Sequence, residues 1–477
     1  MARIAEYEAQ DALGLAAWVR AGEVTPQELL EAAVARVEER NPALNAVVIR
    51  AFEEGRKAIE AGLPEGPLRG VPWLLKDLHA AWKGVRLTNG SRFFADNVPD
   101  YDGELVSRYR RAGLVLFGRT ASPELGGTST TESVLYGETR NPWKPTHSAG
   151  GSSGGAAAAV AAGIVPAAHA TDGGGSIRIP ASCCGLFGIK PTRARVPSGP
   201  KLGEGWSGMS VQNAVSRSVR DSAALLDAAH GPEVGDPYFA PAPARSFLSE
   251  VCADPGRLRI ALQISAFNGS EVDPDCVAAA RDAAELCRSL GHEVEETQLA
   301  VDRDLLARSA GTIIGGSQRA TLVERGAELG REVTADDVEP LTWLIAEQGR
   351  QAGAADYVAA VRGMHRIGRE VARFLERFDV LLTPTMGTPP LPLGRLALTR
   401  GDFPGLVTDL ARTIGFTQLF NASGHPAMSV PLYWSSGGLP IGVQFAGRFG
   451  DEATLFRLAA QLESARPWFL RRPTASA

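Results

Sequence analysis

Residues 148–192 read SAGGSSGGAAAAVAAGIVPAAHATDGGGSIRIPASCCGLFGIKPT, and the rest of the chain is best interpreted outward from them. Two glycine-rich stretches, at 150–155 and 172–176, flank an alanine-rich run at 156–163 that predicts a buried helix. Successive glycine N–H groups form a concavity that binds anions. A serine at its edge, such as Ser176, could attack a carbonyl whose oxygen enters the concavity. The alternative is a pair of glycine-rich turns or a phosphate cradle.

The flanking sequence alternates short apolar runs with amphipathic segments. Buried strands are predicted at 70–77, 114–118, 257–262, 380–385, 426–432 and 441–446. Helices are predicted from the capping box Thr25-Pro26-Gln27-Glu28 to Asn41, at 218–229, 274–290 and 451–465, and through most of 301–378. Strands and helices that alternate in this way indicate an α/β fold with a mixed sheet.

Composition excludes several classes of protein. The chain has 477 residues, 44% hydrophobic and 22% charged, with a net charge of −5. This balance gives no electrostatic case for binding nucleic acid or an anionic membrane. The longest apolar run, 156–165, is far shorter than the roughly 20 residues that span a bilayer, and the acidic N-terminus is unlike a secretion signal. We therefore expect a cytoplasmic protein without nucleic-acid or membrane partners.

Cysteines and histidines give no metal or nucleophile motif. The five cysteines include no CxxC pair, and they suit buried thiols in a reducing compartment. None of the seven histidines stands in a nucleophile–base context. Residues 198–201 match S-x-x-K, but their Gly-Pro prevents the helical turn that would bring the serine and lysine together. We expect no metal and no organic cofactor.

Residues 148–192 resemble the signature segment of the amidase signature family. Residues 70–77, GVPWLLKD, resemble the segment that carries the family's catalytic lysine. The N-terminal residues 11–15 and the C-terminal segments 424–431 and 438–442 are also similar to the family. The resemblance covers nearly the whole chain and is weakest between 231 and 375.

The resemblance implies one large α/β domain, residues 1–477. Its core would be a mixed, mostly parallel, twisted β-sheet flanked on both faces by helices. The implied parts are an N-terminal helical part at 1–70, a catalytic core at 71–230, a variable helical substrate-side part at 231–375, and C-terminal strands and a helix at 376–477 that close the sheet.

The resemblance also implies a Ser-cisSer-Lys triad. Ser176 matches the nucleophile, Ser152 matches the bridging serine whose preceding peptide bond is cis, and Lys76 matches the base. The N–H groups of the oxyanion hole match Gly173, Gly174, Gly175 and Ser176. A loop that borders the substrate matches Gly126, Gly127, Thr128 and Ser129.

The chemistry of these residues is consistent with that assignment. A serine is a poor nucleophile until a base takes its proton, and a lysine is a base only when it is neutral. Burial against the apolar residues 73–75 would lower the pKa of Lys76 by disfavouring the charged form. Ser152 would then relay the proton of Ser176 to Lys76 and later deliver it to the leaving amine.

Two features depart from the commonest family pattern. Gly173 stands where many members have a larger residue, and Cys183-Cys184 form a double cysteine, which we interpret as buried packing. With Ser148-Ala149, they resemble the branch that contains 6-aminohexanoate cyclic dimer hydrolases and related bacterial amidases. We interpret Asp172 and Arg178, which flank the nucleophile, as structural support.

The leading hypothesis is a stand-alone amidase that hydrolyses an uncharged or apolar carboxamide, linear or cyclic, through an acyl-enzyme on Ser176. Small or apolar residues in the candidate pocket segments favour such a substrate: Gly126, Ile313, Gly316, Met386 and Pro389. The alternatives are a carbamate (urethane) or aryl ester hydrolase, the glutaminase-type subunit of a tRNA-dependent amidotransferase, and a binding protein that has lost catalysis. We expect a small-molecule amide as the partner and a monomer or homodimer.

Overall fold

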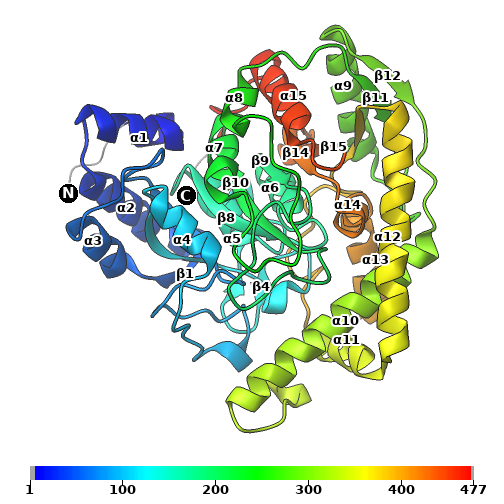
Figure 1. Cartoon of the computed structure of the whole chain (residues 1–477), viewed down its shortest axis with the longest axis horizontal. Coiled ribbons are helices and arrows are strands. Elements are labelled where there is room, and N and C mark those ends of the chain that lie inside the picture. The colour runs from blue at the N-terminus through cyan, green and yellow to red at the C-terminus, as the bar shows by residue number, and fades with distance from the viewer. Residues whose placement is uncertain (1–5, 474–477) are drawn as a thin grey trace.

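Eight strands form the central sheet of the computed structural model, which describes residues 6–473 (Figure 1). Across the sheet they lie in the order β12 (Glu293–Glu296), β11 (Arg259–Leu262), β13 (Val380–Pro384), β15 (Pro440–Gly447), β14 (Ala427–Trp434), β9 (Phe187–Lys190), β10 (Val211–Ser216) and β8 (Ala167–Asp172). Strands from the glycine-rich segment therefore lie beside strands from the end of the chain, with β9 paired to β14.

The sheet is mixed, as expected, but the prediction that it is mostly parallel is wrong. Only β11 pairs in parallel, with β12 and with β13. The other pairings, from β13 through β15, β14, β9 and β10 to β8, are antiparallel. Strands joined by a short turn must run antiparallel, as β14 and β15 do across residues 435–439. Parallel pairing needs a longer crossover, such as the one through α9 (Pro274–Ser289) that connects β11 to β12.

A second sheet of three strands lies beside β8. It has the order β1 (Val47–Arg50), β3 (Val115–Thr120) and β2 (Pro72–Lys76), with β3 antiparallel to β1 and parallel to β2. The backbone N–H of Lys76 in β2 donates a hydrogen bond to Nδ1 of His169 in β8, at 3.2 Å, so the two sheets meet there. Residues 1–70, predicted as a helical part, contain helices and also the short strand β1, which pairs with β3, a strand far along the chain.

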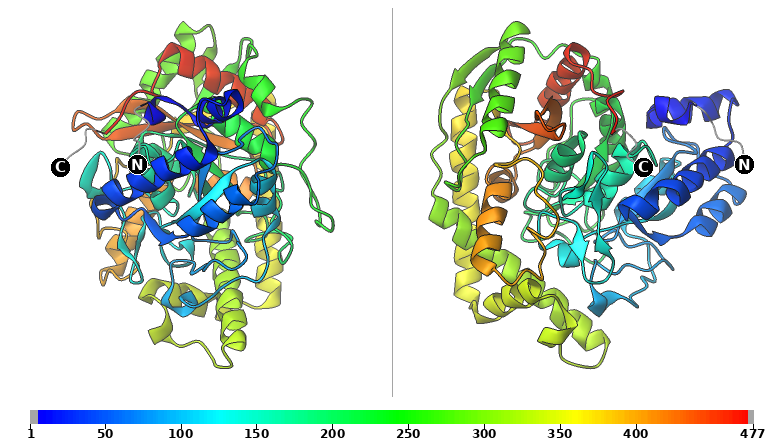
Figure 2. Two further views of the ribbon diagram at one scale, coloured as in Figure 1. Left: turned by 90° about the vertical axis from the view of Figure 1, so that its left-hand side faces the viewer. Right: turned by 180° about the vertical axis from the view of Figure 1, so that it is seen from behind.

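Helices cover both faces of the central sheet, as the resemblance implied. One row of side chains across it, from Ala261 to Leu381, Ala446 and Ala427, belongs to a core cluster shared with α10 (Arg303–Glu328), α12 (Ala354–Arg377) and α14 (Gln418–Ser423). Residues that alternate with this row pack instead against α9 and α15 (Glu452–Ala465). Figure 2 shows α10 and α12 at the side of the molecule opposite its N-terminal helices.

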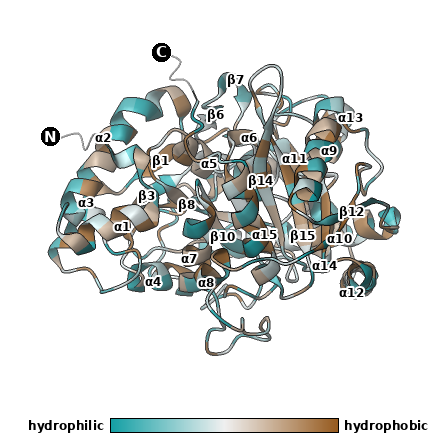
Figure 3. Cartoon of the chain, turned by 90° about the horizontal axis from the view of Figure 1, so that it is seen from above, coloured by the Kyte–Doolittle hydropathy of each residue, from teal (hydrophilic) through white to brown (hydrophobic). Residues whose placement is uncertain are grey.

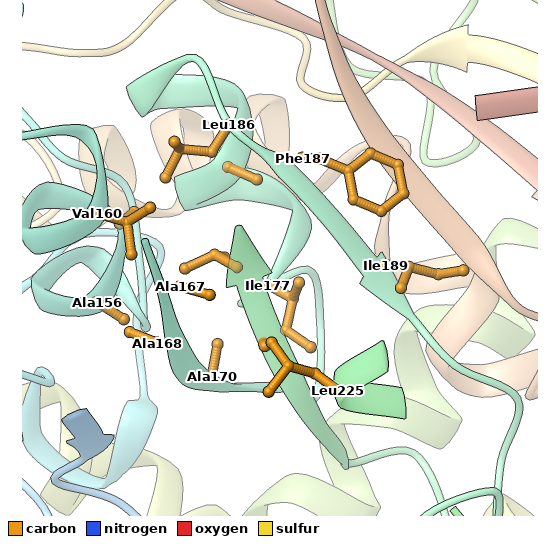
Figure 4. Close-up of a cluster of buried hydrophobic side chains, with 14 of the residues drawn as sticks. Ala156, Val160, Ala167, Ala168, Ala170, Ile177, Leu186, Phe187, Ile189 and Leu225 are labelled. Atoms are coloured by element: carbon orange, nitrogen blue, oxygen red, sulfur yellow. The ribbon is translucent and has the colours of Figure 1, made fainter. Parts of the chain in front are cut away.

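The alanine-rich run forms α5 (Gly154–Ala161), as predicted, and every residue of the helix is buried. Ala156 and Val160 pack over Ala167, Ala168 and Ala170 of β8 (Figure 4). Such small side chains let the helix lie close to the strand. This close packing fixes the loop before α5 relative to the loop after β8, and both loops carry candidate site residues.

The remaining longer helices lie around these layers. They are α1 (Ala12–Ala21), α2 (Pro26–Leu44), α3 (Phe52–Glu60), α4 (Glu104–Arg111), α6 (Arg178–Cys184), α7 (Val219–Ala229), α8 (Phe247–Val251), α11 (Pro340–Gln351) and α13 (Phe403–Ile414). The outer sides of α2 and α13 carry many hydrophilic residues (Figure 3). The capping box of α2 is confirmed, although the helix continues past Pro42 rather than ending at Asn41. Within residues 6–473, no helix has the length and apolarity needed to cross a membrane.

Candidate active site

Lys76 lies at the end of β2 with its side chain fully buried. Its Nζ donates hydrogen bonds to Ser152 Oγ at 2.7 Å and to Thr171 Oγ1 at 2.9 Å. Burial lowers the pKa of Lys76 well below its usual value of 10.5, although the negative charge of Asp172 acts in the opposite direction. Burial therefore shifts the amine toward its neutral form, and the amine contacts two hydroxyls.

Ser152 lies in the loop that precedes α5, and the Gly151–Ser152 peptide bond is cis, as the resemblance implied. The loop packs tightly: a Cβ placed on Gly151 would lie 2.3 Å from the carbonyl oxygen of Thr130, so only glycine fits. The next residue, Ser153, donates to the carbonyl of Thr171 at 3.2 Å and accepts from the N–H of Thr171 at 3.3 Å. These contacts fix the Ser152 loop against β8.

Ser176 lies in the loop between β8 and α6, and it is half-buried. Within the described part of the chain, no hydrogen bond joins its hydroxyl to Ser152 or to any other group. The structure therefore brings Lys76 and Ser152 into direct contact and leaves Ser176 in the neighbouring loop with an unengaged hydroxyl.

The backbone around Ser176 corrects one part of the predicted oxyanion hole. The N–H of Gly175 donates to Asp172 Oδ1 at 2.8 Å, so this donor is already used. A buried carboxylate needs hydrogen-bond donors, and the nearest N–H groups supply them. Among the hydrogen bonds of residues 6–473, the N–H groups of Gly173, Gly174 and Ser176 have no partner. Gly174 also has open space at the position a Cβ would occupy.

The Asp172 carboxylate organises the loop that carries Ser176. It is fully buried and accepts from the Ile177 N–H at 3.1 Å and from two guanidinium nitrogens of Arg178 at 3.0 and 2.8 Å. Burial opposes its ionisation, but the charge and hydrogen bonds of Arg178 outweigh burial and hold the pKa of Asp172 at about 2. This geometry agrees with the interpretation of Asp172 and Arg178 as structural support.

Arg178 is held in turn by groups that sequence reasoning missed. Its guanidinium donates to Gln444 Oε1 at 2.7 Å, Asn421 Oδ1 at 2.7 Å and the Thr417 carbonyl at 2.9 Å. Asn421 also donates to Asp172 Oδ1 at 2.8 Å. A polar residue inside an apolar stretch, as in Phe420-Asn421-Ala422 and Val443-Gln444-Phe445, was the one available signal.

The loop at Gly126–Ser129 lies beside Ser152. A Cβ placed on Gly126 would lie 3.2 Å from Ser152 Oγ. Thr128 does not offer its hydroxyl to this space, because that group donates to the carbonyl of Leu396 at 2.8 Å. Ser129 is buried. The loop therefore borders Ser152 through Gly126.

Three other residues named from the sequence lie in the protein core. Cys183 is buried with its sulfur 3.6 Å from that of Met386, so the thiol and Met386 pack together. Ile313 is fully buried in the cluster beneath α10 and α12. Burial raises the pKa of Cys183 to about 12, so it remains a thiol. In residues 6–473, no group of three His, Cys, Asp or Glu side chains could hold a metal ion.

Comparison with known proteins identifies relatives over the whole chain. The family described as Amidase matches residues 28–456. The 6-aminohexanoate-cyclic-dimer hydrolase of Paenarthrobacter ureafaciens is 40% identical, over 97% of this chain and 96% of its own length. The acylamidase of Rhodococcus erythropolis is 34% identical, over 97% and 96%. A solved structure of 6-aminohexanoate cyclic dimer hydrolase complexed with substrate matches with a TM-score of 0.94 and 39% identity, over 98% of this chain and 99% of that one.

Proposed function

The chain belongs to the amidase signature family and is an amidase, and from this premise we propose that it hydrolyses an uncharged or apolar carboxamide, linear or cyclic, through an acyl-enzyme on Ser176. The observation that carries the proposal is the hydrogen bond between the buried Lys76 amine and Ser152, beside a loop with unpaired N–H groups. A lysine buried in this way serves as the base that a serine nucleophile needs.

The first half-reaction forms the acyl-enzyme. A neutral amine has two N–H groups and one lone pair, so Lys76 donates to Thr171 while its lone pair accepts the Ser152 proton. Ser152 takes the proton of Ser176 at the same time, and Ser176 Oγ bonds to the carbonyl carbon. The carbonyl oxygen becomes an oxyanion, which the N–H groups of Gly173, Gly174 and Ser176 stabilise.

Collapse of this oxyanion completes the acyl-enzyme. The proton held by Lys76 returns through Ser152 to the amide nitrogen, the carbon–nitrogen bond breaks, and an amine leaves. The second half-reaction releases the acid. Water then loses a proton to the same relay and attacks the ester of Ser176. The ester bond breaks, Ser176 regains its proton, and a carboxylic acid is released.

The proposed substrate class is supported in two ways. The relatives are named for amide substrates, and the proposed mechanism requires no charged group on the substrate. Two relatives are named as a hydrolase of the cyclic dimer of 6-aminohexanoate and as an acylamidase, which supports an uncharged amide. The second candidate is hydrolysis of carbamates or aryl esters, since the same oxyanion hole serves any acyl group. A glutaminase-type subunit of an amidotransferase is the less favoured alternative. We further propose that the enzyme works in the cytoplasm as a monomer or homodimer. We also propose that it has no nucleic-acid or membrane partners, which the net charge of −5 supports.

The experiment uses the isolated chain and a Ser176→Ala variant. A fluorophosphonate probe should form one covalent adduct, at Ser176, and the variant should lose hydrolysis while keeping its melting temperature. The kcat/KM for hexanamide should exceed that for free glutamine. Labelling at Ser152 or Ser198 would contradict the nucleophile, and a preference for glutamine would favour the amidotransferase subunit.

A further inference from the structure

The hairpin at residues 205–210 has an unusual backbone. Gly205 and Ser210 pair across its base. Between them Trp206, Ser207 and Gly208 have φ of 52°, 50° and 79°, so three consecutive residues are left-handed. A residue as bulky as tryptophan rarely adopts this conformation, and it persists only where the surroundings enforce it, often at a functional site.

Contacts from two directions enforce this conformation at the tip. The carbonyl of Gly208 accepts a hydrogen bond from Nε of Arg193 at 2.9 Å. The hydroxyl of Ser207 bonds the hydroxyl of Tyr357, which lies on α12. The tip is therefore fixed to the body of the protein at the two residues that follow Trp206.

The hairpin is also tied to the loop that carries Ser176. The carbonyl of Met209 accepts from Asn421 Nδ2 at 3.1 Å. The same amide nitrogen donates to the carbonyl of Asp172 at 2.9 Å and to its carboxylate at 2.8 Å. One side chain thus sets the position of the hairpin relative to the proposed oxyanion loop.

The indole ring of Trp206 lies directly against Gly173. A Cβ placed on Gly173 would lie 2.7 Å from Cζ3 and 2.9 Å from Cε3 of the ring. This contact gives a physical reason for the glycine at 173. Trp206 is only half-buried, and its ring lies against a residue whose N–H group is unpaired.

We propose that Trp206 is a specificity-determining residue, whose indole forms an apolar wall next to the scissile carbonyl and favours amides with a large apolar or aromatic substituent. The inference rests on the proposed function, because it takes residues 173–176 as the loop that receives the carbonyl oxygen. An indole face offers a flat surface on which a methylene chain or an aryl ring packs, whereas a methyl group gains little from it. The rigid tip holds that surface in place before substrate arrives, which reduces the ordering cost of binding.

The test compares Trp206→Ala and Trp206→Phe with a matched control, Trp18→Ala, which removes a half-buried tryptophan on α1. The kcat/KM is measured for acetamide, hexanamide and N-phenylhexanamide. These substrates form two ratios, one for acyl size and one for amine size. We expect Trp206→Ala to lower at least one of these two ratios, the kcat/KM of the larger substrate divided by that of the smaller one, by about tenfold. Trp206→Phe should keep most of that ratio, and Trp18→Ala should change neither.

Unchanged ratios in both series would overturn the inference, including the case in which kcat/KM falls equally for all three substrates. Labelling of Ser176 by a fluorophosphonate separates this failure from failure of the proposed function. If Ser176 is labelled in every variant while the ratios are unchanged, only the role of Trp206 is wrong. If the wild-type chain is not labelled there, the proposed function itself fails.

A second measurement tests the contact with Gly173. Gly173→Ala introduces a methyl group that meets the indole, so its effect on the substrate ratio should depend on the residue at 206. We expect Gly173→Ala to change the ratio several-fold in the wild-type chain and much less in the Trp206→Ala background. Equal effects in both backgrounds would show that the ring against Gly173 does not set the preference.

Discussion

Two lysines in this protein are fully buried at strand ends, Lys76 at the end of β2 and Lys190 at the end of β9. Burial lowers the pKa of both, and for Lys190 it combines with the positive charge of Arg178 to give a pKa of about 7. Their hydrogen bonds differ. Lys76 donates to two hydroxyls, whereas Lys190 donates to the carbonyl of Pro191 at 2.9 Å.

The different hydrogen-bond partners of the two lysines show that a lowered pKa is not by itself sufficient for a catalytic role. Both amines favour the neutral form more than a lysine in water does, so both have the electronic property of a general base. A carbonyl has no proton to give, while the hydroxyl of Ser152 does. Of these two lysines, only Lys76 contacts a hydroxyl that it could deprotonate, so geometry rather than pKa is the reason for proposing it as the base.

Replacing each lysine by methionine gives the largest expected contrast. Lys76→Met should reduce kcat/KM for hexanamide by about a thousandfold or more, because no other base lies beside Ser152. Lys190→Met should keep kcat/KM within about tenfold, since Lys190 contacts none of the proposed reacting groups. Melting temperatures of both variants provide the control for folding. Near-normal activity of Lys76→Met would contradict its role as the base.

Ser152→Ala tests the comparison of the two lysines further, because it removes the hydroxyl that Lys76 contacts and that Lys190 lacks. Cleavage of an amide requires protonation of a poor leaving group, whereas p-nitrophenolate leaves without that help. We expect Ser152→Ala to slow hydrolysis of hexanamide more than hydrolysis of p-nitrophenyl hexanoate. The measurement is kcat/KM for both substrates in both proteins. Equal losses would mean that Ser152 does not deliver the proton to the leaving amine.

The dependence of kcat/KM on pH also tests whether Lys76 rather than Lys190 is the base, and it leaves Lys76 and Ser152 in place. Because Lys76 must be neutral, kcat/KM should rise with pH and level off above the pKa of Lys76, which lies well below 10.5. Lys190→Met should show the same profile, because Lys190 is outside the relay. A flat profile between pH 5 and 9, or one that changes on loss of Lys190, would refute this assignment.

The smallest expected effect is on stability, where Lys190 has a measurable role. Its pKa is about 7 in the folded protein and near 10.5 when unfolded, so between these values the unfolded chain binds more protons. The free energy of unfolding contributed by Lys190 therefore rises with pH across this window. Relative to Lys190→Met, the wild-type chain should gain stability from pH 7 to 10 in urea titrations. If the difference in free energy of unfolding between the two proteins stays constant from pH 7 to 10, the pKa of Lys190 is not lowered.

The parts of the site that are local in sequence were predictable. The glycine-rich loops, the alanine-rich helix and the burial of Lys76 depend on neighbouring residues, and each was expected from the sequence. The cis peptide bond before Ser152 came from the family resemblance rather than from the residues themselves.

The rest depends on contacts between distant segments. Asn421 and Gln444 reach Arg178 across 243 and 266 residues, and no local pattern reports such contacts. The hydrogen bond from the Gly175 N–H to Asp172 depends on where the folded chain places the Asp172 carboxylate, which the sequence does not show. The mostly parallel central sheet was implied by the family resemblance and is wrong; the alternation of strands and helices could not correct it, because alternation does not by itself fix which strands are neighbours. The short strand β1 was missed for the same reason.

The meeting of the two sheets at Lys76 and His169 has a consequence for how activity arises during folding. In the proposed mechanism the base comes from the small sheet, whereas Ser152 precedes α5 and Ser176 follows β8, with Lys76 and Ser152 separated by 76 residues. The small sheet alone then contains no relay, so we expect no amide hydrolysis from a partly assembled chain. Under this proposal, catalytic activity reports the long-range docking of the small sheet beside β8, and not the formation of that sheet alone.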